Sequence, residues 1–393
     1  MIRKIGLGLL GLLAVGAIAF FAIAPGYVDR DMNRVDPALA IAVSPEAQVL
    51  HDSLTIVDLH ADTLLWKRNM LDRADHSHVD LPRLQHGNVA LQVFSSVTKT
   101  PAGQNYDNND DSTDRITLLA FGQLQPVRTW FSLTERTLWH AEKLDRAIAT
   151  SDAQMMGIRD NVDLAVLDAG RLVDGNLVGA LLSVEGLHNL EGDRTRLFDL
   201  YEAGVRMAGL VHFFDNEVAG SMHGVNKGGL TFMGREVVQQ MEDMGMVVDI
   251  AHCSHQCVAE VLAMARRPVI SSHGGVQATC DENRNLTDEE IRGIAATGGV
   301  VGIGFWDGAV CETSPRAIAR AMRHVRDLVG IETVALGSDF DGTVTTPFDT
   351  TGLAQITQAL MDEGFSEDEI RLAMGENAIR VLAGGLSPMQ ESP

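Results

Sequence analysis

Residues 54–62 read Leu-Thr-Ile-Val-Asp-Leu-His-Ala-Asp and combine two features that decide the fold. The run 54–58 is short, apolar and rich in β-branched residues, which is typical of a strand covered on both faces. His60 and Asp62 follow it two positions apart, so the alternation of side chains along a strand predicts that both face the same way. The stretch therefore predicts a buried strand whose end carries polar, chemically active groups.

Similar runs recur along the chain, and most of them are separated by segments with helical periodicity such as 234–244, 257–266, 288–296 and 314–329. Parallel strands need a crossover connection, and eight strand-helix units predict an α/β fold, the closed (β/α)8 TIM barrel. A helical insertion over 98–176 is expected between the second and third strands. The eight candidate strands are 54–58, 89–94, 178–184, 205–211, 246–250, 268–270, 299–303 and 333–336.

Six of the eight candidate strands end in a metal-ligand or acid-base side chain. Catalytic residues of such barrels gather at the rim formed by the carboxyl ends of the strands, so these side chains are expected to converge. Imidazole and carboxylate groups together suit zinc or a similar divalent ion. Histidines in loops or on helices, His188 and His255 among them, are expected to be structural. The strand-end residues are His60, Asp62, Glu185, His212, His252, His273 and Asp339.

Length and composition favour one folded domain over 51–393, the expected barrel. Hydrophobic residues make up 45% of the 393-residue chain and charged residues 21%, which is typical of a globular protein. The formal net charge of -22 excludes a nucleic-acid-binding function, because phosphate recognition needs clustered lysine and arginine.

The N-terminus predicts attachment to a membrane. Residues 5–24 are 20 consecutive residues without a charge, about the length that crosses a bilayer, so 1–27 is expected to be a transmembrane anchor. The positive-inside rule then puts the catalytic domain outside the cytoplasm, on the periplasmic side in a bacterium. The alternative is secretion after cleavage of a signal peptide at 22–24, although Pro25 would disfavour that cleavage. Residues 28–50 are expected to be a linker.

The four cysteines are too few for a disulfide framework. Cys253 and Cys257 flank His252 and could form a thiolate metal site or be structural. Cys280 and Cys311 would pair in an exported protein if their loops meet.

A series of ordered stretches between 55 and 382 resembles the membrane dipeptidase (renal dipeptidase) family of zinc peptidases, within the wider amidohydrolase group of metal-dependent barrels. Many matches in the same order are more specific than one motif. The stretches that carry the resemblance are 58–62, 80–84, 184–186, 230–231, 234–238, 248–252, 268–273, 284–285, 337–342 and 377–382.

The resemblance implies a binuclear zinc site. His60 and Asp62 would hold one ion, His252 and His273 the other, and Glu185 would bridge the two. Two divalent ions about 3.5–4 Å apart activate a shared water, so the nucleophile would be a hydroxide that bridges both ions.

The resemblance also implies residues that act on a dipeptide. His212 would polarise the scissile carbonyl and stabilise its oxyanion, and Asp339 would transfer a proton to the leaving nitrogen. Arg284 would receive the free carboxylate of the substrate. The chain departs from the family pattern at Trp306, where relatives often carry a tyrosine, and at Glu282-Asn283. These departures concern substrate contacts and leave every expected metal ligand in place.

The expected function is therefore a zinc-dependent dipeptidase that cleaves L-Xaa-L-Xaa dipeptides, with L-Xaa-D-Xaa dipeptides as an open extension. Two alternatives remain. A binuclear amidohydrolase could act on N-acyl amino acids or lactams, because a shared fold does not fix the substrate. An inactive membrane-anchored protein could bind peptides through the same barrel. A homodimer is also open.

Overall fold

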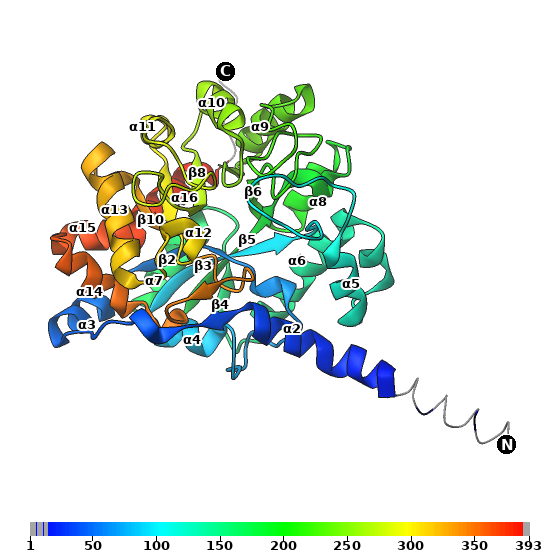
Figure 1. Ribbon diagram of the computed structural model, residues 1–393. Helices are drawn as coiled ribbons and strands as arrows, with labels where there is room; N and C mark the ends of the chain where they lie inside the picture. The colour runs from blue at the N-terminus through cyan, green and yellow to red at the C-terminus, as the bar shows by residue number, and fades with distance from the viewer. Residues whose placement is uncertain (1–4, 6–10, 12–14, 388–393) are drawn as a thin grey trace.

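The computed structural model describes Ile5, Gly11 and residues 15–387. Eight parallel strands form a closed barrel surrounded by helices (Figure 1), in the order β2, β3, β5, β6, β7, β8, β9 and β10, with β10 paired to β2. The predicted barrel and all eight predicted strands are confirmed. The strands are β2 Ile56–Ala61, β3 Val89–Val97, β5 Val178–Glu185, β6 Val205–Gly209, β7 Val247–Asp249, β8 Ile270–Gly274, β9 Val300–Ile303 and β10 Val334–Leu336.

The barrel interior is apolar toward the amino ends of the strands. One buried cluster takes side chains from each of the eight strands, for example Val57, Leu181 and Ile270, and it includes Leu382 of α16 (Asn377–Gly385). Burial of this apolar surface stabilises the closed barrel. The carboxyl ends of the strands are left to carry polar side chains.

Helices cover the outside of the barrel, and those predicted over 234–244, 257–266, 288–296 and 314–329 are confirmed. Each begins after a serine or threonine whose side chain caps a backbone N–H group, as Ser254 does at the start of α10. The helices that come after barrel strands, outside the 98–176 insertion, are α4 Leu81–His86, α8 Arg196–Glu202, α9 Phe232–Met244, α10 His255–Met264, α11 Asp288–Ala296, α12 Asp307–Val310, α13 Pro315–Val329, α14 Ala354–Asp362 and α15 Glu367–Arg371.

The insertion between the second and third barrel strands is mainly helical, as predicted. It contains α5 (Arg115–Gly122), α6 (Leu133–Ala149) and α7 (Asn161–Arg171). It also contains β4 (Met155–Gly157), which pairs with β5 outside the barrel. This strand was not predicted, because three residues are too few to show a periodic pattern.

The N-terminal segment enters the described structure as a helix that leads into α2 (Ala24–Met32) (Figure 1). Within the described part of the chain, no helix is both long and apolar enough to cross a membrane. Part of the anchor predicted over 1–27 lies outside the described residues.

Residues 28–50 are folded against the barrel, which differs from the linker predicted for them. Asp29 is buried and accepts hydrogen bonds from Ser77 Oγ at 2.7 Å and Arg68 Nε at 3.0 Å. Farther along, β1 (Arg34–Val35) pairs with β11 (Thr345–Thr346), and α3 (Pro45–Asp52) packs beside α14. These partners lie far away in the sequence, so local composition gave no sign of them.

Candidate metal centre

Five predicted ligands converge at the carboxyl ends of the strands. His252 Nε2 lies 2.9 Å and His273 Nε2 3.3 Å from Glu185 Oε1. His60 Nε2 lies 3.7 Å from that same oxygen and 3.5 Å from Asp62 Oδ1. All three histidines therefore approach the same Glu185 oxygen, and Asp62 lies beside His60, so the five side chains form one cluster.

The donor atoms of this cluster fit a metal better than they fit one another. All five side chains are buried, yet neither ring nitrogen of His60 has a hydrogen-bond partner among the described residues. The Asp62 Oδ1 atom also lacks one. Buried polar atoms without partners are costly, and a bound cation would satisfy these lone pairs. Ligand-capable atoms in this cluster group within 4.8 Å of one another in sets such as His60, Glu185 and His273.

Burial controls the ionisation of the cluster. It raises the pKa of the Glu185 and Asp62 carboxyls well above their usual range, and the neighbouring carboxylates add to the effect. Burial also lowers the pKa of His252 and His273 well below their usual value, so both rings are neutral. Neutral imidazoles with free lone pairs are the form that binds a metal ion.

The backbone is strained where two site residues leave their strands. His252 follows β7 with φ 64° and Asp339 follows β10 with φ 61°, in the left-handed region that non-glycine residues rarely adopt. Such conformations cost about 1–3 kcal/mol and cluster at functional sites. The turns bring both side chains to the mouth of the barrel, where Asp339 Oδ1 lies 3.9 Å from His60 Nε2.

A second layer of hydrogen bonds orients the ligands. Ser272 Oγ donates to Asp249 Oδ2 at 2.5 Å and lies 2.9 Å from His273 Nδ1. With the hydroxyl hydrogen used for Asp249, His273 Nδ1–H donates to Ser272 and leaves Nε2 free to bind a metal. Asp58, two residues before His60, is also buried. It accepts hydrogen bonds from the backbone N–H and the hydroxyl of Ser338. Such outer partners fix ring orientation at metal sites.

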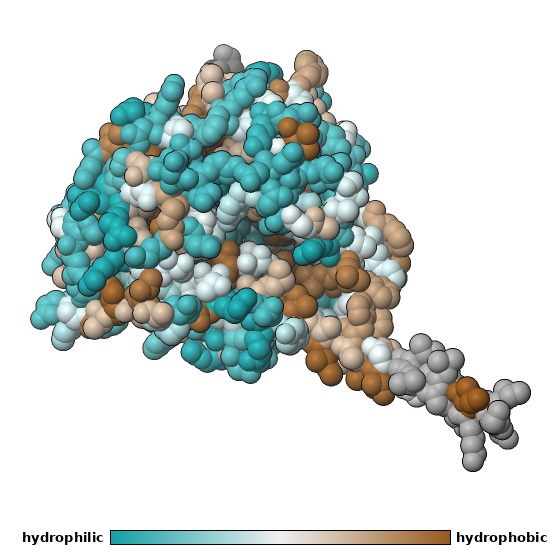
Figure 2. Space-filling view, in the orientation of Figure 1, coloured by the Kyte–Doolittle hydropathy of each residue, from teal (hydrophilic) through white to brown (hydrophobic). Residues whose placement is uncertain are grey.

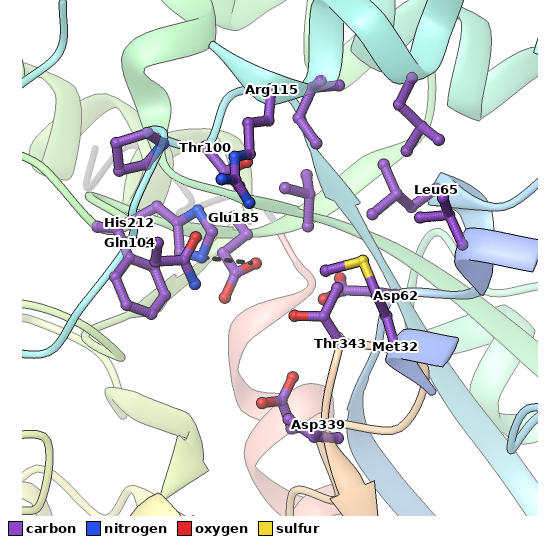
Figure 3. Close-up of a pocket in the computed structure, with 18 of the residues that line it drawn as sticks. Met32, Asp62, Leu65, Thr100, Gln104, Arg115, Glu185, His212, Asp339 and Thr343 are labelled. Carbon is purple, nitrogen blue, oxygen red and sulfur yellow. Dashed lines mark ion pairs between the residues drawn. The ribbon is translucent and has the colours of Figure 1, made fainter. Parts of the chain in front are cut away.

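His212 completes the cluster beside Glu185. It follows β6, and its Nε2 atom lies 3.4 Å from Glu185 Oε2, a pair that Figure 3 marks with a dashed line. Burial lowers the pKa of His212 well below its usual value, so the ring is neutral. A neutral imidazole here can donate one hydrogen bond into the pocket.

Arg284 is a buried cation beside the metal ligands. Its Nη2 atom donates to the His273 carbonyl at 2.9 Å and lies 3.5 Å from His252 Nε2. Within the described residues, it makes no salt bridge with a carboxylate. Buried arginine is nearly always paired, so this guanidinium is available to an anionic group of a ligand. Gly274, with φ 158°, makes room for it, because a Cβ there would lie 3.0 Å from Arg284 Nη1.

Sequence reasoning missed Tyr106, which comes from the loop before α5 and lines the same pocket. Its hydroxyl accepts a hydrogen bond from Trp306 Nε1 at 2.8 Å, and its carbonyl accepts one from His223 Nδ1 at 2.9 Å. The Arg284 guanidinium lies over the face of the Trp306 ring, and its Cζ atom is 5.7 Å from the centre of that ring. The loop is rich in glycine, asparagine and aspartate, and nothing in that composition points to a pocket residue.

The remaining predictions about histidines and cysteines can now be judged. His188 bonds to Thr98 Oγ1 at 2.8 Å, and His255 pairs with Glu290 at 2.7 Å, so both have protein partners outside the metal cluster. Cys280 and Cys311 form a disulfide, which confirms their predicted pairing. Cys253 and Cys257 are free and buried, and the ligand groups found among the described residues do not include them.

The barrel fold and this cluster define a class of protein, a metal-dependent hydrolase with its site at the carboxyl ends of the strands. Comparison with known proteins makes the assignment specific. The sequence model of the membrane dipeptidase family (peptidase family M19) matches residues 45–385. The chain belongs to this family. The predictions of an enzyme and of a metal-dependent dipeptidase are therefore confirmed.

Individual relatives agree with this assignment. Dipeptidase aclJ of Aspergillus oryzae is 30% identical over 361 residues, which cover 86% of this chain and 80% of the relative. A metallopeptidase of Rhodobacter sphaeroides, solved with a phosphinate mimic of the dipeptide L-Ala-D-Ala, is 21% identical with a TM-score of 0.69, covering 84% of this chain and 99% of that one. The probable dipeptidase PvdM of Pseudomonas aeruginosa is 18% identical with a TM-score of 0.71, covering 87% and 98%. At these identities the two structures show the shared fold.

We predict that Ser272→Ala weakens metal binding about 10- to 100-fold, because His273 loses the partner that fixes its ring. Metal affinity would be measured by competition with a chromophoric chelator. Ser271→Ala is the matched control, since this neighbouring buried serine has no part in the bond to His273. Equal affinities of both variants and the parent would contradict the orienting role of Ser272.

Proposed function

We propose that this chain is a zinc-dependent dipeptidase with two ions in its site. His60 and Asp62 would hold one ion, His252 and His273 the other, and Glu185 would contact both. The observation that carries the proposal is that the Nε2 atoms of His60, His252 and His273 lie within 3.7 Å of Glu185 Oε1. Both ring nitrogens of His60 and the Oδ1 atom of Asp62 also lack protein partners among the described residues. Nitrogen and oxygen ligands of this kind suit zinc.

Bound divalent ions would supply a hydroxide nucleophile near neutral pH and polarise the scissile carbonyl. The protein supplies the remaining groups. His212, neutral and buried, donates a hydrogen bond toward the carbonyl oxygen, where negative charge develops during attack. The Asp339 carboxyl faces the pocket 3.9 Å from His60 Nε2, where it would take up the proton released by the nucleophile and deliver it to the leaving amide nitrogen.

Arg284 gives the site its preference for a substrate that ends in a carboxylate. Its guanidinium can form two parallel hydrogen bonds with the terminal carboxylate of a dipeptide, while a longer peptide would place a neutral amide there. Trp306 lies against Arg284 and takes its position partly from Tyr106, so both aromatic residues shape the contact with the substrate.

We also propose that the N-terminal segment anchors the enzyme in a membrane, with the catalytic domain outside the cytoplasm. Residues 5–24 carry no charge. Figure 2 shows apolar surface gathered where the N-terminal helix meets the barrel, and Ile23, Leu118 and Phe131 are among the exposed apolar residues of these segments. An apolar surface next to an apolar helix fits the interface of a bilayer. A homodimer stays a prediction.

The function is tested with purified protein and a panel of substrates. We expect hydrolysis of L-Ala-L-Ala and measure L-Ala-D-Ala, N-acetyl-L-Ala and a lactam beside it. Chelation should abolish activity and zinc should restore it. Hydrolysis of N-acetyl-L-Ala without either dipeptide would favour the amidohydrolase alternative. Zinc-loaded protein that binds dipeptides and cleaves none of these substrates would favour the peptide-binding alternative.

Arg284→Met should raise KM for L-Ala-L-Ala about 10- to 100-fold, because a hydrogen-bonded charge pair contributes about 1.5–3 kcal/mol. The same variant should have little effect on L-Ala-L-Ala amide, which lacks the carboxylate. Steady-state kinetics on both substrates measures this, with bound metal as the control for an intact site. Equal losses on the acid and the amide would show that Arg284 does not read the carboxylate.

The membrane proposal predicts that the full chain sediments with membranes, resists extraction by salt or carbonate, and is released by detergent. Chains that lack residues 1–27 would lose α2 contacts as well, so the matched change is Leu10→Arg with Leu13→Arg in the uncharged stretch. These two charges should release the protein. Recovery of the unaltered protein in the soluble fraction would favour secretion after signal cleavage.

A further inference from the structure

The pocket above the candidate metal centre is larger than a dipeptide requires. Its volume is about 1120 Å³, whereas pockets of about 300–1,000 Å³ accommodate drug-sized ligands. Asp62, Glu185, His212 and Asp339 point into one part of this space (Figure 3). The additional space therefore lies beyond the catalytic groups.

One side of the pocket is an apolar lobe built from segments far apart in the sequence. Leu65, Trp66, Val97 and Ile116 form a buried cluster, and Val28 and Leu119 pack against it. All six of these residues line the pocket. Figure 3 shows Leu65 and Met32 on the side of Asp62, away from His212. The name apolar lobe is used below for the six residues of this cluster, Val28, Leu65, Trp66, Val97, Ile116 and Leu119.

The N-terminal segment provides the outer wall of this lobe. Ala24, Val28 and Met32 of α2 line the pocket, as Phe20 does before them. Phe20 contacts α5 closely, with its ring 5.8 Å from that of Phe121. Part of the segment predicted as an anchor and linker therefore lines the catalytic pocket.

The position of the lobe indicates which end of a substrate it faces. Arg284 lies against His252 and His273, which come from the ends of β7 and β8. Leu65, Trp66 and Val97 come from the ends of β2 and β3, on the opposite side of the eight-stranded barrel. With its carboxylate at Arg284 and its amide at the metal centre, a substrate directs its amino-side group toward the lobe.

We propose that the apolar lobe is a specificity subsite for a large apolar group on the amino side of the scissile amide. The group is either the side chain of a residue such as phenylalanine or leucine, or an aliphatic acyl chain on the nitrogen-terminal side of an amino acid. Both are apolar and both would displace water from the same surface. This inference rests on the proposed metal-dependent hydrolysis and names the substrate class for it.

The test compares kcat/KM for large and small amino-side groups in the full-length enzyme. The substrate pairs are L-Phe-L-Ala with L-Ala-L-Ala, and N-octanoyl-L-Ala with N-acetyl-L-Ala. We expect a preference of tenfold or more for the larger member of at least one pair, since each buried methylene alone can change specificity about 10-fold. The pair that shows the preference identifies a side chain or an acyl chain as the group that binds.

Val28→Trp should fill the lobe and reduce that preference at least fivefold. Val127→Trp is the matched control, because Val127 is 60% exposed in the short helix Val127–Trp130 and does not line the pocket. It should leave the preference unchanged. Thermal unfolding of both variants checks that the fold is retained.

Two results would overturn the inference alone: hydrolysis of L-Ala-L-Ala with no preference in either pair, or a Val28→Trp variant whose preference equals that of the parent. A zinc-loaded parent that hydrolyses none of the four substrates would overturn the proposed function and this inference together.

Discussion

The arrangement of charge around Glu185 is the constraint on which the rest of the site depends. Three buried carboxyl groups, Asp62, Glu185 and Asp339, lie in one pocket with Arg284 as the nearby cation. Burial and mutual repulsion oppose their ionisation, and the adjacent histidines are neutral because burial opposes their protonation as well. Divalent cations would reverse this balance, since they stabilise the ionised carboxylates and bind the free imidazole lone pairs.

The barrel explains how one pocket can collect these groups. Parallel strands place their carboxyl ends on one rim, so residues more than 200 positions apart meet there. The apolar cluster beneath the rim keeps the strands in register, and Asp58 and Asp249 fix the turns above it through Ser338 and Ser272. The strained backbone of His252 is held on both sides, because Ala251 N–H donates to Asp249 Oδ1 before it and Ser254 N–H donates to the Gly220 carbonyl after it.

The sequence was informative where a local pattern has a direct physical consequence. Strand runs, side-chain alternation and residue type predicted the barrel and the convergence of His60 with Asp62. The docking of Asp29 against Arg68, the place of Tyr106 above Trp306 and the contact of Val28 with the apolar lobe depend on partners distant in the chain. No periodicity or composition records such contacts, so these features emerged only from the folded structure.

The central claim is that Glu185 lies between two metal ions. It is tested most directly by a crystal structure of the zinc-loaded protein with anomalous diffraction measured on both sides of the zinc absorption edge. The account predicts two zinc peaks, one within bonding distance of His60 and Asp62 and the other of His252 and His273, with a Glu185 oxygen bound to each. A single peak at full zinc loading, or a second ion bound away from Glu185, would contradict it.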